Sequence, residues 1–148
     1  MNPAPIFRWL DDVLGTGGHV VAFNMAQRMG EEMAALVTKN NDKTSRFEDP
    51  TLEQVMAVVY QRGFGRAVQL SRESFNRDIV KIHIVDPPTR ETQGSFVFFL
   101  AGLWSGIAAR VCGTQCSFVK AQPSENALTL YLRTKKTESG ELKNRSGD

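Results

Sequence analysis

The sequence is poor in the residues from which disulfide frameworks and metal sites are built. Its 148 residues include two cysteines and two histidines. Cys112 and Cys116 lie four residues apart, whereas a disulfide framework uses more cysteines at wider spacings. Neither His19 nor His83 has another ligand-type side chain at metal-binding spacing in its own predicted element. We therefore expect a reduced, cytoplasmic chain with no metal site and no cofactor.

Charge of one sign is also lacking. Eighteen basic and sixteen acidic residues leave a net charge of +2, and no run of five like charges occurs. This balance argues against a nucleic-acid partner. The adjacent acidic pairs at 11–12 and 31–32 fall on predicted helices, where neighbouring side chains diverge by about 100° and cannot converge on one substrate. We read both pairs as solvent-facing and predict no catalytic residues.

One long apolar segment stands out against this composition. Residues 94–113 carry no charge before Arg110, and the eighteen residues 92–109 are all uncharged. That length is close to the lower limit for a membrane span, but glycines and serines dilute the hydrophobic side chains. The N-terminus also lacks the basic and apolar regions of a secretory signal. We predict that the segment is the buried central helix of the domain and no integral membrane span.

Periodicity divides the rest of the chain into helices and strands. Apolar residues recur at helical spacing in 5–14, 19–39 and 52–62, and alternate in 66–71, 78–86, 116–121 and 127–133. The glycine-rich stretch 15–18 breaks the first two helices apart, and Pro50 is placed to open the third. The predicted order α-α-α-β-β-α-β-β gives an α+β fold, with helices on one face of a four-stranded, mainly antiparallel sheet. One domain would span 1–133, followed by a disordered polar tail over 134–148.

Three short motifs stand out in the predicted elements: GFGR at 63–66, I-x-I-x-D-P at 82–87 and F-x-x-G-x-x-x-G at 99–106. They resemble those of the 4-vinyl reductase domain family, which is related to the small α+β subunits of the TRAPP vesicle-tethering complexes. The resemblance covers about 7–133. It implies an α+β domain that is commonly dimeric through its N-terminal helices and has a hydrophobic cavity between helices and sheet. In that family the cavity is associated with small hydrophobic ligands, including tetrapyrroles.

The chain departs from these families in its cysteines. Many family members have a cysteine near the start of the apolar helix and two around the last hairpin. Here Val97 and Phe98 occupy the first region, and SEN at 124–126 forms the last turn. Some TRAPP subunits carry an acylated cysteine in an N-terminal helix, whereas this chain has none before Cys112. Neither cysteine-dependent feature is carried over.

Two sets of residues are candidate binding surfaces. Gly102 and Gly106 give the central helix a strip without side chains, which favours close packing on another helix or the sheet over a ligand. The aromatic face of that helix, with two methionines, is either core or the lining of a hydrophobic pocket. The predicted pocket comprises Met29, Met33, Phe96, Phe99, Leu100, Leu103, Trp104 and Ile107, and the predicted dimer interface comprises Ile6, Phe7, Leu10 and Val13.

Three functions are compatible with these features. The first is a non-catalytic homodimer that binds a hydrocarbon, lipid or tetrapyrrole-like ligand beside the helix 94–112, for sensing or carriage. The second is a TRAPP-like assembly subunit with a protein partner. The third is a component of a tetrapyrrole vinyl reductase, which would need a reductant, and the sequence has no dinucleotide-binding motif to hold one.

Overall fold

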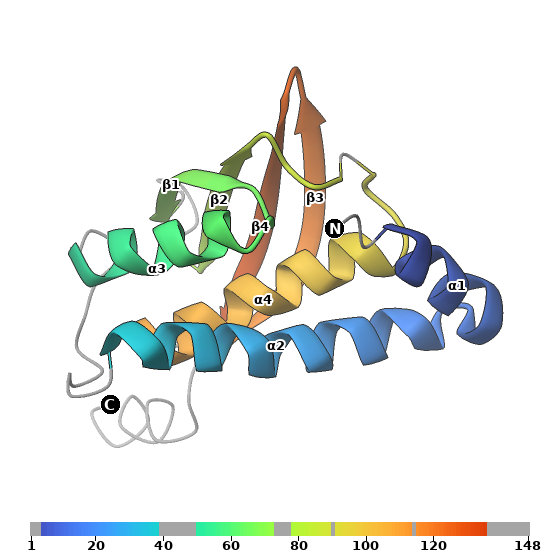
Figure 1. Ribbon diagram of the computed structural model, residues 1–148, viewed down its shortest axis with the longest axis horizontal. Coiled ribbons are helices and arrows are strands. Elements are labelled where there is room, and N and C mark those ends of the chain that lie inside the picture. Colours follow the sequence, from blue (N-terminus) through green and yellow to red (C-terminus); the bar gives the residue numbers. More distant parts are fainter. Residues whose placement is uncertain (1–3, 39–49, 73–77, 90, 114, 136–148) are drawn as a thin grey trace, which may run out of the picture.

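The computed structural model describes residues 4–38, 50–72, 78–89, 91–113 and 115–135 (Figure 1). Its four helices and four strands follow the predicted order, and their bounds lie within a few residues of those predicted. The predicted tail lies outside the described residues from residue 136 on. So does the polar segment 39–48, whose composition predicts a surface loop. The helices are α1 (Ala4–Leu14), α2 (Gly17–Thr38), α3 (Pro50–Gln61) and α4 (Ser95–Cys112), and the strands are β1 (Arg66–Arg72), β2 (Ile79–Val85), β3 (Gln115–Ser124) and β4 (Ala127–Lys135).

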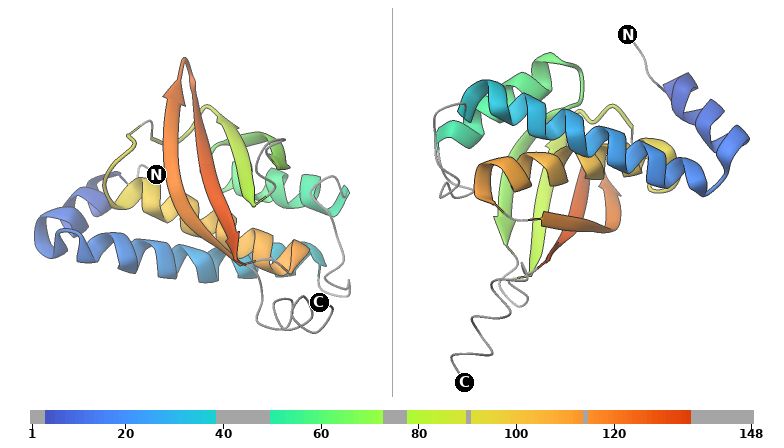
Figure 2. Two further views of the ribbon diagram at one scale, coloured as in Figure 1. Left: turned by 180° about the vertical axis from the view of Figure 1, so that it is seen from behind. Right: turned by 90° about the horizontal axis from the view of Figure 1, so that it is seen from below.

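The strands form one sheet in the order β1-β2-β4-β3, and each neighbouring pair is antiparallel. Two hairpins are thus joined along β2 and β4, where Ile82 pairs with Leu130. The helices lie together on one face of this sheet (Figures 1 and 2). The predicted α+β architecture is confirmed. Two boundaries were wrong: β3 continues to Ser124, and β4 takes in two residues that we had assigned to the tail.

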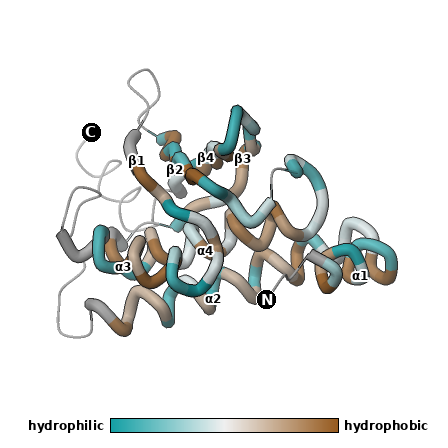
Figure 3. The backbone as a smooth tube through the Cα atoms, turned by 45° about the horizontal axis from the view of Figure 1, so that its top comes forward, coloured by the Kyte–Doolittle hydropathy of each residue, from teal (hydrophilic) through white to brown (hydrophobic). Residues whose placement is uncertain are grey.

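The two faces of the sheet differ as alternation requires. Toward the helices, β2 and β4 present a row of buried aliphatic side chains. On the other face, His83 Nδ1 lies 3.0 Å from Thr129 Oγ1, and Lys120 Nζ lies 4.8 Å from the Tyr131 ring centroid. Along the chain, hydrophobic residues are concentrated in α4 and hydrophilic residues at the turn between β3 and β4 (Figure 3). The buried aliphatic residues are Val80, Ile82, Ile84, Leu128, Leu130 and Leu132.

Helix α4 is the centre of the core, as the sequence predicts. All its residues from Ser95 to Ala108 are buried except Phe98, which is partly buried. The helix ends at Gly113, whose left-handed backbone (φ 70°) lets its N–H bond the carbonyl of Ala109 at 3.1 Å. Helix α2 packs along one side of α4, and the sheet covers another side. No helix among the described residues has the length and hydropathy to span a bilayer.

Glycines allow α2 and α4 to run side by side in close contact. A Cβ atom added at Gly102 would collide with the carbonyl oxygen of Phe23, and one at Gly106 with that of Gln27. The arrangement is reciprocal, because a Cβ on Gly30 of α2 would collide with the carbonyl oxygen of Leu103. The prediction of close packing on another helix or the sheet is confirmed, and the partner is a helix. The close contact also gives a packing reason for Gly30, whose presence within a helix is otherwise destabilising.

A carboxylate from α1 caps α4. The residue before α4 is Gly94, which has no side chain to bond the free N–H groups of the first turn. Asp11 takes this role: its oxygens accept the Ser95 N–H at 3.0 and 3.2 Å and the Ser95 hydroxyl at 2.6 Å. Asp11, which we read as solvent-facing, is 35% exposed but also makes this contact. The sequence gives no sign of the contact, because it joins residues 84 positions apart. The bond fixes α1 to the start of the central helix.

Replacing Asp11 with alanine is expected to lower the free energy of unfolding by about 2 kcal/mol. The loss arises because the fully buried Ser95 would keep an N–H and a hydroxyl without their acceptor. Urea denaturation measures it. The neighbouring exposed carboxylate provides the control, since Asp12→Ala should change stability by less than about 0.5 kcal/mol. Equal effects of the two substitutions would show that Asp11 is not a cap.

Candidate functional site

Exposed hydrophobic side chains are concentrated on α1 and the first half of α2. Seven large ones are between 45% and 61% exposed there: Leu14, the last residue of α1, and six others. Isolated exposed hydrophobic residues are ordinary, but a concentration of them on two consecutive helices is typical of a protein-binding surface. We call the six others the α1–α2 apolar surface; they are Ile6, Trp9, Val13, Val20, Val21 and Met25.

Helix α1 is apolar on two sides, and the structure divides the predicted dimer interface between them. Phe7 and Leu10 are 5% and 8% exposed and belong to the core of their own chain. The Phe7 ring stacks on Phe96, with centroids 4.5 Å apart. Ile6 and Val13 lie on the outward side and are 55% and 57% exposed. The interface stays a prediction, but only these two of its four residues are available to a partner.

Sequence reasoning missed Trp9 and the three residues on α2. Trp9 is three residues after Ile6 and four before Val13, so the helical period alone places the three side chains on one face. This signal was present in the sequence. The exposure of Val20, Val21 and Met25 could not be predicted in the same way, because apolar residues occur on several sides of the first half of α2 and only its packing shows which side faces α4.

None of the hollows lined by described residues gathers the eight residues of the predicted ligand pocket. The six on α4 are at most 4% exposed and pack as core. Met29 and Met33 instead line a hollow of about 210 Å³ at the side of α2, together with Leu36 and Phe64. Glu32 and Arg62 complete its lining. Phe64 links the hollow to the core, since its ring centroid lies 5.5 Å from that of Phe99. The ligand site stays a prediction, and this hollow is where its two methionines lie.

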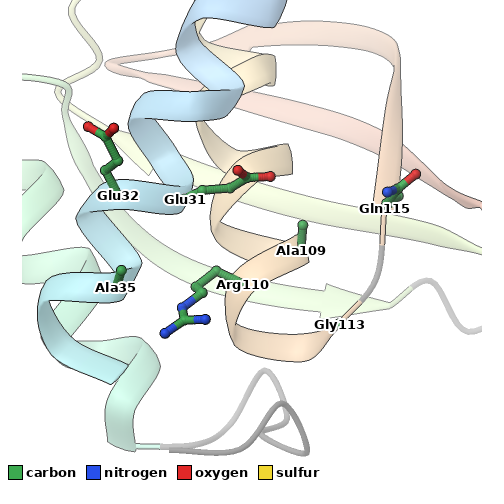
Figure 4. Close-up of a pocket in the computed structure, with 7 residues that line it drawn as sticks. All are labelled: Glu31, Glu32, Ala35, Ala109, Arg110, Gly113 and Gln115. Atoms are coloured by element: carbon green, nitrogen blue, oxygen red, sulfur yellow. The ribbon is translucent and has the colours of Figure 1, made fainter. Parts of the chain in front are cut away.

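A larger cavity of about 590 Å³ lies between the C-terminal halves of α2 and α4 (Figure 4). Arg110 extends from α4 into the space between the helices, and its Nε is buried without an acceptor among the described residues. Glu31 and Glu32 point in different directions, as expected for adjacent positions on a helix. The cavity therefore has no converging pair of carboxylates for acid–base chemistry. Ala35, Ala109, Gly113 and Gln115 complete the lining.

Serine, aspartate and histidine side chains meet near the start of α4, but not in a catalytic arrangement. His19 Nε2 lies 3.7 Å from Asp11 Oδ1, and the Ser95 hydroxyl donates to the same oxygen. In a serine hydrolase the imidazole stands between serine and carboxylate and takes the hydroxyl proton. Here the carboxylate stands in the middle, and Ser95 is fully buried. The cluster is a helix cap. Among the described residues no group of three His, Cys, Asp or Glu side chains is placed to hold a metal ion.

Comparison with known proteins identifies the fold but no family. No protein-family model matches the chain, and no curated protein sequence matches it. Among solved structures, the chain is similar to a trafficking protein particle complex subunit 3 from Naegleria fowleri, crystallised with covalently bound palmitic acid. The alignment covers 91% of each chain, with a TM-score of 0.53 and 11% sequence identity. The chain has the α+β fold of a small TRAPP subunit, and nothing in the comparisons supports membership of the 4-vinyl reductase family.

Proposed function

We propose that this chain is a non-catalytic assembly subunit that binds another folded chain through the α1–α2 apolar surface, most simply a second copy of itself. The observation that carries the proposal is the exposure of six large hydrophobic side chains on that surface. Fully burying one such side chain contributes about 1.5–3 kcal/mol, so even partial burial of six favours association strongly.

The surface suits a symmetric dimer. In a two-fold interface each copy uses the same patch, so the patch must be self-complementary. Aliphatic side chains such as Val13, Val21 and Met25 meet this condition, because their contacts need no partner of opposite charge. The structural neighbour is named as a subunit of a complex, which agrees with an assembly role. The cytoplasmic location predicted from the sequence is compatible with it.

Binding of a small hydrophobic ligand is the second candidate function. The hollow beside Met29, Met33, Leu36 and Phe64 favours it, since these four apolar side chains join two charged ones, Glu32 and Arg62, and ligand sites combine apolar walls with a few polar groups. Its volume of about 210 Å³ is below the usual range for such sites, which limits the occupant to a small molecule. The acyl group of the structural neighbour is a property of that protein, and this chain has no cysteine before Cys112.

Trp9 fluorescence tests the assembly proposal. The chain has two tryptophans, so Trp104→Phe leaves Trp9 as the only one. Because Trp9 is 61% exposed in the single chain, covering it should move its emission to shorter wavelengths as protein concentration rises. Far-ultraviolet circular dichroism checks that the variant is folded. Emission from Trp9 that stays at long wavelength at every concentration would contradict association through this surface.

A further inference from the structure

A third hollow, separate from the predicted ligand pocket, lies where α2, α4 and β3 meet. It has a volume of about 250 Å³. None of its lining residues belongs to the eight predicted from the sequence, and none is Lys, Arg, Asp or Glu. We call it the aromatic hollow; its lining residues are His19, Val20, Phe23, Asn24, Phe98, Ser117 and Phe118.

Three rings in this hollow are held in a fixed arrangement. The His19 imidazole stacks on Phe98, with centroids 4.4 Å apart and planes inclined by 12°. Phe118 meets Phe98 edge-on, with centroids 5.0 Å apart and planes inclined by 77°. Both geometries are among those that aromatic pairs prefer. His19, Phe98 and Phe118 are each only partly buried, so their rings remain partly accessible.

The cap of α4 lies next to these rings and helps to fix them. His19 Nε2 lies 3.7 Å from the carboxylate of Asp11, which is itself fixed by two groups of Ser95. Phe98 follows Ser95 by three residues on α4, so the cap also fixes the position of its ring. A site that is rigid before binding loses little conformational entropy when a ligand enters. Asn24 and Ser117 add polar groups to the lining.

We infer that the aromatic hollow binds a single planar aromatic ring system of phenyl or indole size. An incoming ring can extend the existing stacked and edge-on set. The volume is just below that of sites for drug-sized ligands, which suits one or two fused rings. The ring is uncharged or cationic, because no Lys or Arg lines the hollow and the Asp11 carboxylate lies 3.7 Å from His19 Nε2.

Such a ring can be a free compound or a side chain of a second copy, for which Trp9, more exposed than Tyr60, is the candidate. The hollow shares Val20 with the α1–α2 apolar surface, but binding of a ring does not require assembly. A chain that stays monomeric and binds indole would refute the proposed assembly function and support ring binding in the aromatic hollow. A dimer that does not bind indole would support assembly and refute ring binding.

Titration of the protein with indole, followed by nuclear magnetic resonance, tests the inference. The aromatic resonances of His19, Phe98 and Phe118 should shift and saturate with a dissociation constant on the order of 1 mM. Indole-3-carboxylate should bind at least about tenfold more weakly, because its charge is unmatched. Absence of a saturable shift up to the solubility limit of indole, or equal binding of the anion, would overturn the inference.

Filling the hollow provides the matched comparison. Ser117→Trp should weaken indole binding at least about tenfold, whereas Val119→Trp, on the same strand but outside the lining, should leave it unchanged. Asn24→Trp, from the α2 side, replaces Ser117→Trp if the latter does not fold.

The effect of indole on the oligomeric state identifies the source of the natural ring. If indole lowers the dimer fraction and Trp9→Ala does the same, the natural ring is the tryptophan of a second copy. If indole binds without changing the molar mass, the natural ring is a free compound. Indole binding that survives both filling variants would show that the ring site is elsewhere.

Discussion

Replacing Gly102 with valine is expected to abolish the cooperative unfolding transition of the domain. A single Cβ at this position would collide with the carbonyl oxygen of Phe23, and the neighbouring backbone atoms of Phe23 lie within 3.0 Å. Backbone of a long helix cannot move aside as a flexible side chain can. Overpacking a core typically costs about 1–3 kcal/mol, and a β-branched side chain against backbone exceeds that range. Because a domain is stable by only about 5–15 kcal/mol, the substitution removes much or all of its stability.

A smaller side chain at the same position should cause a smaller loss of stability. Gly102→Ala should lower the free energy of unfolding by about 3 kcal/mol in urea denaturation. Gly17→Ala is the matched control, since a Cβ there meets only the Cβ of Leu14 at 3.9 Å. The control should be neutral or slightly stabilising, because alanine favours the helical state over glycine. Native stability in Gly102→Val would show that α2 and α4 are not in close contact.

The second large effect concerns assembly. Introducing glutamate at Val13 and Val21 together should weaken self-association by at least about a hundredfold, since two charges would have to be buried without partners. Both side chains are about half exposed in the single chain, so the fold should tolerate the change. Sedimentation equilibrium over a range of concentrations measures the dimer constant.

The control for this double variant introduces glutamate at an exposed hydrophobic residue outside the α1–α2 apolar surface. Leu36 is 63% exposed on the far end of α2, and Leu36→Glu should leave the dimer constant unchanged. Phe7→Asp is not suitable, because Phe7 packs on Phe96 and Phe99 and its replacement would unfold the chain. Thermal melting of each variant separates loss of folding from loss of association. An unchanged dimer constant in the double variant would place the interface on another surface.

The order of elements was predictable because it depends on local periodicity. Alternation in β2 and β4, helical spacing in α3 and the uncharged run of α4 each identify their element from adjacent residues. The close approach of α2 and α4 was predictable in part, since glycines on a helix indicate a neighbour without identifying it. Sequence could not tell that Gly102 meets Phe23 while Gly30 meets Leu103, because that depends on the register between two helices.

The candidate site was less predictable, for two physical reasons. An apolar stripe on α1 indicates burial but does not say whether the core or a partner covers it; Phe7 turned inward and Ile6 outward. The role of Asp11 depends on a hydrogen bond to Ser95, far away in the sequence, and the position of either residue alone gives no sign of it. Side chains that act through long-range tertiary contacts are recognised only when the fold is known.

The molar mass of the chain in solution tests the central claim most directly. We predict that light scattering on the wild-type protein gives twice the mass of one 16.5 kDa chain, and that the Val13→Glu, Val21→Glu variant gives the mass of one. A wild-type chain that remains monomeric at high concentration, or a double variant that remains dimeric, would contradict the assignment of the α1–α2 apolar surface as the site of self-assembly.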